Sequence, residues 1–236
     1  MTAYDIFSKH YDEVMGDRSG TAAMLDNLIK KNNPNAKTVL EIACGTGSIL
    51  KYFAKKYKVY GFDISRGMLS LAKRSVPSGT FSRQNMVSFR FSERFDVILC
   101  VFDSVNHLLK FSDWIKMFTL VKEHLNKGGL FIFDMNTDFK LQKKIKSPAW
   151  VLHFGKHLMI LKVLDDGNGI SNWNVKVFQN ISKNKYTLYE EDIREKSFPL
   201  RKVKEALKLF RKVVIIDTSR KHPSIKSERL FFICRK

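Results

Sequence analysis

The first 135 residues alternate between two hydrophobic patterns. Short apolar runs, typical of buried strands, alternate with segments in which apolar residues recur every three or four positions, as on one face of a helix. The predicted strands cover residues 38–43, 58–63, 80–83, 95–102 and 130–134. The predicted helices cover residues 19–31, 48–57, 66–75 and 112–127, the last with Ile115 facing inward and with Gly128 and Gly129 at its end. Apolar strands separated by amphipathic helices predict a doubly wound α/β domain, whose parallel sheet binds ligands at the carboxyl ends of its strands.

The pattern changes after Asn136. Four strand-like segments follow without intervening helices, at residues 150–154, 157–164, 170–179 and 186–198. The Asp-Asp-Gly-Asn-Gly stretch at residues 165–169 indicates a hairpin turn. A helix is predicted from Pro199, and two last strands at residues 213–218 and 229–234. We therefore expect a core of residues 1–140, an inserted antiparallel sheet of residues 141–198 that covers the ligand site, and a segment of residues 199–236 that completes the core sheet.

Composition narrows the class of protein. The 236 residues include 42 Lys and Arg against 23 Asp and Glu, a formal charge of +19, with 44% hydrophobic residues. No apolar run approaches the roughly 20 residues that span a bilayer, and residues 1–10 lack the apolar stretch of a signal peptide. Three scattered cysteines, Cys44, Cys100 and Cys234, predict neither a disulfide framework nor a metal site. We expect a soluble, cytoplasmic protein with reduced thiols, not associated with membranes, as a monomer or a homodimer.

The sharpest chemical signal is a glycine turn after the first predicted strand. The sequence Glu-Ile-Ala-Cys-Gly-Thr-Gly covers residues 41–47, and the second strand ends at Asp63. Glycines let a backbone approach a ligand closely, and a carboxylate at Asp63 can accept hydrogen bonds from both hydroxyls of a ribose. A dinucleotide site needs a third glycine or an alanine where this chain has Leu50. The charge of Glu41 favours a cationic ligand over a pyrophosphate.

These residues resemble motif I and the ribose-binding strand of the class I S-adenosylmethionine (SAM) dependent methyltransferases. The resemblance extends to Phe-Asp-Val-Ile at residues 95–98, Gly-Gly-Leu at residues 128–130 and the closing strand pair. It implies a Rossmann-like, seven-stranded sheet of order 3-2-1-4-5-7-6 with the last strand antiparallel. The segments at residues 100–107 and 133–137 are most similar to a small-molecule group that includes amino-sugar N-methyltransferases. The implied reaction is methyl transfer to a small molecule, at nitrogen more than at oxygen.

The resemblance also implies a set of cofactor-binding residues. Gly45 and Gly47 are expected beside the methionine part of SAM, with valine at Gly47 filling ligand space but leaving the fold intact. Asn85 stands where the family usually has an acid for the adenine amino group. The full expected set is Tyr11, Glu41, Ala43, Gly45, Gly47, Asp63, Ile64, Met68, Asn85, Met86, Cys100 and Val101.

The acceptor side is expected on the loop after the fourth strand. Asp103, Asn106 and His107 are the catalytic candidates, as groups that orient the acceptor or take its proton. Asp134 and Asn136, after the fifth strand, come next. We also expect Glu41, Asp63, Asp103 and Asp134 to form one acidic mouth that favours cationic SAM over its product, S-adenosylhomocysteine.

Two other functions stay open at this point. The excess charge, of which residues 182–236 carry 16 basic against 7 acidic side chains, would suit an RNA methyltransferase. Nucleic acid is not favoured as a partner, because no common nucleic-acid-binding signature occurs in the sequence. A SAM-binding protein without turnover is the other alternative.

Overall fold

The computed structural model describes residues 4, 8–183 and 185–236, which form two sheets. The larger has seven strands in the order β10-β11-β5-β4-β1-β2-β3. Its strands are β1 (Thr38–Ile42), β2 (Lys58–Asp63), β3 (Thr80–Arg83), β4 (Phe95–Cys100), β5 (Leu125–Asn136), β10 (Lys212–Ile216) and β11 (Arg229–Arg235). Strand β11 runs antiparallel to both of its neighbours, whereas the pairs from β5 to β3 are parallel. The predicted strand order and the antiparallel last strand are confirmed.

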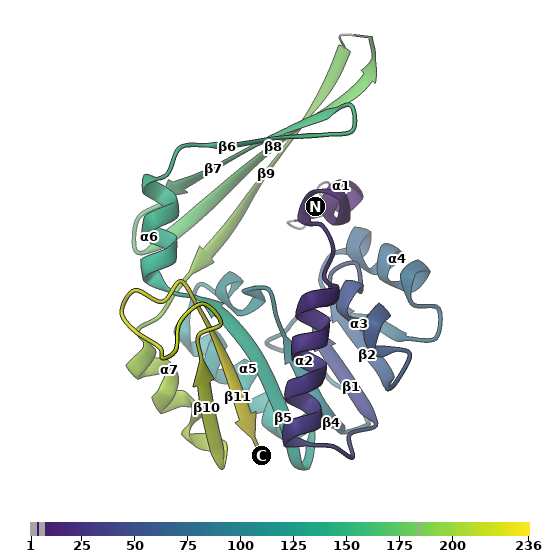
Figure 1. Ribbon diagram of the computed structural model, residues 1–236, viewed down its shortest axis with the longest axis vertical. Helices are drawn as coiled ribbons and strands as arrows, with labels where there is room; N and C mark the ends of the chain where they lie inside the picture. The colour runs from purple at the N-terminus through teal and green to yellow at the C-terminus, as the bar shows by residue number, and fades with distance from the viewer. Residues whose placement is uncertain (1–3, 5–7, 184) are drawn as a thin grey trace.

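Helices cover both faces of this sheet (Figure 1). On one face lie α2 (Ser19–Asn32), α3 (Ser48–Phe53) and α4 (Arg66–Ser75), packed on strand residues such as Val39 and Val97. On the other face lie α5 (Phe111–His124) and α7 (Leu200–Ala206), packed on Leu40 and Phe133. Because strand side chains alternate between faces, apolar strands bury both, as the sequence pattern predicts.

The structure corrects the sequence prediction in three places. Helix α5 ends at His124, and Gly128 and Gly129 lie inside β5, where the pairing of β4 with β5 shifts register. Ile115 is 44% exposed and does not face the core. Helix α6 (Asp138–Lys146) was not expected. Thr137 caps it by accepting a hydrogen bond from the Lys140 amide, and only one of its residues is buried, so its hydrophobic signal is weak.

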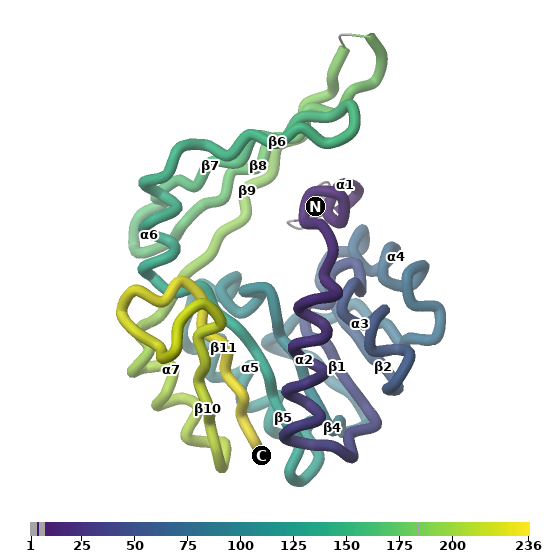
Figure 2. Tube along the Cα trace, viewed as in Figure 1, coloured from purple at the N-terminus to yellow at the C-terminus, as the bar shows by residue number. Residues whose placement is uncertain are grey.

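The smaller sheet, called the cover sheet below, has the antiparallel order β6-β7-β8-β9. Its strands are β6 (Trp150–Phe154), β7 (His157–Asp165), β8 (Ile170–Ser182) and β9 (Lys185–Lys196). It stands over the carboxyl ends of the core strands, and helix α1 (Ser8–Met15) lies between it and the core (Figures 1 and 2).

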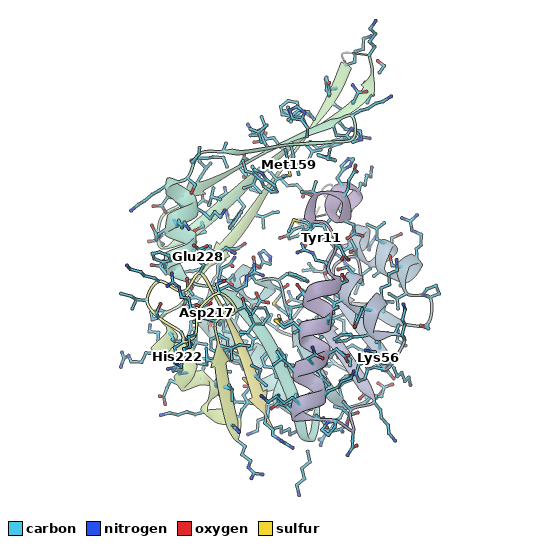
Figure 3. All side chains as sticks on the ribbon, viewed as in Figure 1. Tyr11, Lys56, Met159, Asp217, His222 and Glu228 are labelled. Atoms are coloured by element: carbon cyan, nitrogen blue, oxygen red, sulfur yellow. The ribbon has the colours of Figure 1, made fainter. Side chains whose placement is uncertain are left out.

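The cover sheet buries its apolar face on the N-terminal segment. Phe154, Met159 and Val177 form a hydrophobic cluster with Tyr11 and Val14 of α1. Tyr11 lies directly below Met159 in Figure 3. The cover sheet therefore packs on α1, and its apolar face is not buried on the mouth of the ligand site alone. Among the described residues, no helix combines the length and the apolar character that crossing a membrane requires.

Candidate functional site

The glycine turn joins β1 to α3 through three residues with positive φ. Ala43, Gly45 and Gly47 have φ of 53°, 54° and 75°. A Cβ built on Gly45 meets no atom within 4 Å, and Gly45 borders the cavity described below. A Cβ on Gly47 would lie 3.2 Å from the Ala72 Cβ of α4. Gly45 is thus the glycine that leaves room for a ligand, whereas Gly47 permits close packing of α3 on α4. Gly47 does not line the cavity, so its expected contact with the ligand stays a prediction.

Asp63 holds this turn from the neighbouring strand end. Its Oδ2 accepts a hydrogen bond from the Gly45 amide (2.9 Å), and its Oδ1 accepts one from the Ser65 amide (2.9 Å). Burial raises the pKa of Asp63, and these two amides partly oppose the rise. Each carboxylate oxygen keeps a second lone pair, so the group can still accept hydrogen bonds from a ligand.

A cavity of about 630 Å³ opens at these strand ends. Its walls come from the core strands, from Tyr4 and Tyr11 near the N-terminus, and from residues 192–194 of β9. Most of the predicted cofactor residues line it: Tyr11, Glu41, Ala43, Gly45, Asp63, Ile64, Met68, Asn85, Met86 and Val101. Gly47 and Cys100 do not line the cavity. Cys100 is fully buried among core residues.

Two of these residues have surroundings that bear on adenosine binding. Ile64 is 46% exposed although it is apolar, which leaves a hydrophobic surface at the cavity for a flat ring. The Asn85 Oδ1 accepts a hydrogen bond from the Val87 amide (3.0 Å). Asn85 therefore keeps one lone pair for an adenine amino group and no charge.

Two ionisable side chains in the cavity each have one buried atom without a hydrogen bond among the described residues. Glu41 is 3% exposed, and its Oε2 is buried without a hydrogen bond. Burial, followed by the charge of Asp63, raises the pKa of Glu41 well above its usual range. Arg18, which the sequence analysis did not single out, stacks over Phe102 with its guanidinium carbon 4.4 Å from the ring centroid, and its Nη2 is buried without a partner. A carboxylate oxygen and a guanidinium nitrogen that are both buried without a hydrogen bond fit a zwitterionic ligand.

His107 is the catalytic candidate that reaches the cavity. Its Nδ1 lies 3.2 Å from the Arg194 carbonyl oxygen of β9, and its Nε2 lies 3.3 Å from the Tyr4 hydroxyl. Because a carbonyl oxygen only accepts, this pair places the proton on Nδ1 and leaves the Nε2 lone pair directed at Tyr4. Nε2 is therefore the nitrogen of His107 that can accept a hydrogen bond on the cavity side.

Asp103 and Asp134 do not belong to the predicted acidic mouth. Both carboxylates pair with Arg229 of β11, Asp134 at 3.3 Å, and neither lines the cavity. Glu41 and Asp63 alone of the four expected acids border it. All four acids lie near the site, as their positions toward the ends of strands predict. The side chains of Asp103 and Asp134, however, point away from the cavity.

Asn106 and Asn136 form a fully buried pair behind the cavity. The Asn136 amide donates to the Asn106 Oδ1 (2.9 Å), and the Asn106 Nδ2 donates to the Asn136 carbonyl (3.0 Å). The Asn106 Nδ2 also donates to the Lys196 carbonyl at the end of β9 (3.0 Å). These two side chains join the core to the cover sheet, and Asn106 does not line the cavity.

Comparison with known proteins agrees with this geometry. Residues 39–129 match a methyltransferase domain family. The chain is 29% identical to the putative methyltransferase YqeM of Bacillus subtilis, over 99% of this chain and 97% of that protein. It is 28% identical to a dTDP-3-amino-3,4,6-trideoxy-alpha-D-glucopyranose N,N-dimethyltransferase of Streptomyces venezuelae, over 55% of each chain.

Solved structures share the whole architecture. A SAM-dependent methyltransferase from Clostridium acetobutylicum superimposes with a TM-score of 0.85 at 22% identity, over 98% of both chains. CalS10, an amino pentose methyltransferase from Micromonospora echinaspora, superimposes with a TM-score of 0.80 at 17% identity, over 98% of this chain and 97% of that one.

The chain thus has the fold of SAM-dependent methyltransferases of known structure, and its residues 39–129 match a methyltransferase domain.

Proposed function

We propose that the chain is a SAM-dependent methyltransferase and that it acts on an amine of a small molecule held between the core and the cover sheet. The observation that carries the proposal is the cavity, which is walled by the glycine turn and Asp63 on one side and by β9 on the other. A volume of about 630 Å³ lies within the range of small-molecule sites. Similarity to amino-sugar N-methyltransferases supports nitrogen as the methylated atom.

The cofactor assignment follows the charges in the cavity. Asp63 accepts hydrogen bonds from the ribose hydroxyls, and Ile64 and Met68 contact the adenine. Glu41 balances the positive charge at the methionine end, and Arg18 pairs with the carboxylate. Bound SAM supplies an electrophilic methyl group on a sulfonium.

His107 manages the proton of the acceptor in this proposal. An amine must be neutral to act as a nucleophile, and the methylated product must lose a proton to end neutral. The Nε2 lone pair of His107 accepts that proton from the cavity side, with the Tyr4 hydroxyl 3.3 Å away. The remaining contribution is alignment in a site screened from water by α1 and the cover sheet.

Methyl-labelled SAM tests the function directly. The protein is incubated with labelled SAM and either a panel of amino sugars and small primary amines or total RNA, and the products are identified by mass spectrometry. We expect label in an amine. His107→Asn is expected to lower kcat/KM for that amine about 100-fold while leaving SAM affinity within a few-fold. Label in RNA, or no transfer at all, would contradict the proposal.

Glu41→Gln should separate folding stability from cofactor binding. The pKa of Glu41 is higher in the folded protein than in the unfolded chain. Without a ligand, the free energy of unfolding therefore falls as the pH rises from the ordinary glutamate pKa through the pKa of the folded state. Glutamine removes that ionisation, so the variant should melt at a higher temperature than the wild type at pH 7 and at a similar one near pH 4. Its affinity for SAM should fall about tenfold, and its affinity for S-adenosylhomocysteine should fall less. Calorimetry and thermal melting at several pH values check both; equal loss for the two ligands would argue against a role in charge recognition.

A further inference from the structure

The turn after β4 holds two consecutive residues in the left-handed region without glycine. Phe102 has φ of 58° and Asp103 has φ of 54°. An aromatic residue rarely adopts this strained conformation, which persists only where its surroundings enforce it. The neighbouring Val101 and the Phe102 ring both line the cavity. The strained turn therefore forms part of the cofactor side of the site.

Side chains from two other strands hold this turn in place. The Asp103 amide donates to the Asp134 Oδ2 (3.1 Å), and the Asn136 Nδ2 donates to the Asp103 Oδ2 (2.8 Å). The Arg229 guanidinium contacts the Asp103 carboxylate through Nη2 and lies 3.3 Å from the Asp134 Oδ2 through Nη1. Arg229 thus pairs with both acids at once, which a planar guanidinium does and a lysine ammonium does poorly.

Electrostatics make Arg229 the central member of this group. Asp134 is fully buried, and burial, with the charge of Asp103 added, raises its pKa to about 6 although Arg229 opposes the rise. Burial also acts to raise the pKa of Asp103, but the positive charges of Arg229 and Lys140, with His107, together hold that pKa below its usual range. Without Arg229, the buried Asp134 and the partly buried Asp103 would lose the one guanidinium that contacts both of them, and the turn would lose the charge pairing that fixes it.

The Phe102 ring of this turn also supports Arg18. The Arg18 guanidinium lies over the Phe102 ring at 4.4 Å and presents its buried, unpartnered Nη2. We propose that Arg229 is a positioning residue for cofactor binding, which fixes the Phe102–Asp103 turn and so places the Phe102 ring and Arg18 at the cofactor pocket. This inference rests on the proposed placement of the SAM carboxylate at Arg18. Arg229 itself does not line the cavity.

A double-mutant cycle tests this indirect role. The variants are Arg229→Lys, Phe102→Leu and the double variant, and the measurement is SAM affinity by calorimetry, with thermal melting to confirm folding. We expect Arg229→Lys to weaken SAM binding about 5- to 20-fold in the wild type, and less than about twofold when leucine already replaces Phe102. Arg235→Lys, at the exposed end of the same strand, should change neither quantity.

The outcomes separate this inference from the proposed function. Wild-type protein that does not bind SAM would overturn both. Wild-type protein that binds SAM while Arg229→Lys weakens binding equally in both backgrounds, or not at all, would overturn only the role of Arg229. If Arg229→Lys fails to fold, Asp103→Asn replaces it in the same cycle, because it keeps the side-chain shape but loses the charge paired with Arg229. The same non-additivity with Phe102→Leu is then expected, and additive losses would refute the inference.

Discussion

Asp63→Ala is expected to weaken SAM binding about 100-fold. A hydrogen bond to a charged group is worth about 1.5–3 kcal/mol, which corresponds to roughly 10- to 150-fold in affinity. Asp63 does more than accept ribose hydroxyls, because its two oxygens also hold the Gly45 and Ser65 amides. Alanine removes both functions, so the loss should lie toward the upper end. Calorimetric titration with SAM gives the affinity, and urea unfolding gives the accompanying loss of stability.

Two further variants make this result specific. Asp63→Asn keeps one acceptor oxygen and should weaken SAM binding less than alanine does. Asp113→Ala, an acid in the first turn of α5, should leave SAM affinity unchanged. If Asp63→Ala binds SAM as tightly as the wild type, Asp63 is not the ribose ligand, and the placement of adenosine in this cavity is wrong.

Gly47→Val should destabilise the protein by about 3 kcal/mol or more. Gly47 has φ of 75°, a region that β-branched residues avoid, and its new Cβ would lie 3.2 Å from the Ala72 Cβ and 3.3 Å from the Ala72 Cα. The second contact is with backbone, so relief requires α3 and α4 to move apart. Urea unfolding monitored by circular dichroism measures the loss.

Gly45→Ala is the matched variant for the same turn. Its Cβ would meet no atom of the chain within 4 Å, so only the strain of φ at 54° remains, at about 1 kcal/mol. It should weaken SAM binding because the methyl group occupies ligand space. A Gly47→Val protein as stable as the wild type, or a Gly45→Ala protein with full SAM affinity, would reverse the roles assigned to the two glycines.

The glycine turn shows what sequence reasoning can and cannot supply. The spacing of the two glycines after an apolar strand predicts a tight turn beside a ligand. Which of them faces the ligand depends on the packing of α3 against α4, and no local pattern specifies that. Gly128 and Gly129 pose the same problem, since tolerance of positive φ suits a helix end and an irregular strand equally.

The fold was more predictable than the charged side chains. Apolar runs predicted six of the seven core strands to within two residues at each end, because a doubly covered sheet needs side chains that are apolar on both faces. Strand β5 begins five residues before its predicted start. Arg18 and Arg229 gave no comparable signal, since each is one of 42 basic residues without a motif around it. Asp103 and Asp134 are adjacent to strand ends, but only the position of Arg229 in space shows which way their carboxylates turn.

The cover sheet has a consequence for how such an enzyme can diversify. Strands β6 to β9 form one continuous stretch of sequence, whereas the groups assigned to the cofactor come from separate turns and the N-terminal segment. A single recombination event could therefore replace the whole cover sheet and leave the residues assigned to the cofactor unchanged. Met159 and Val177 limit that freedom, because they pack in one cluster with Tyr11 of α1. A replaced cover sheet would need an α1 helix that packs against it. Residues about 150 positions apart in the chain, such as Tyr11 and Met159, are therefore expected to change together during evolution.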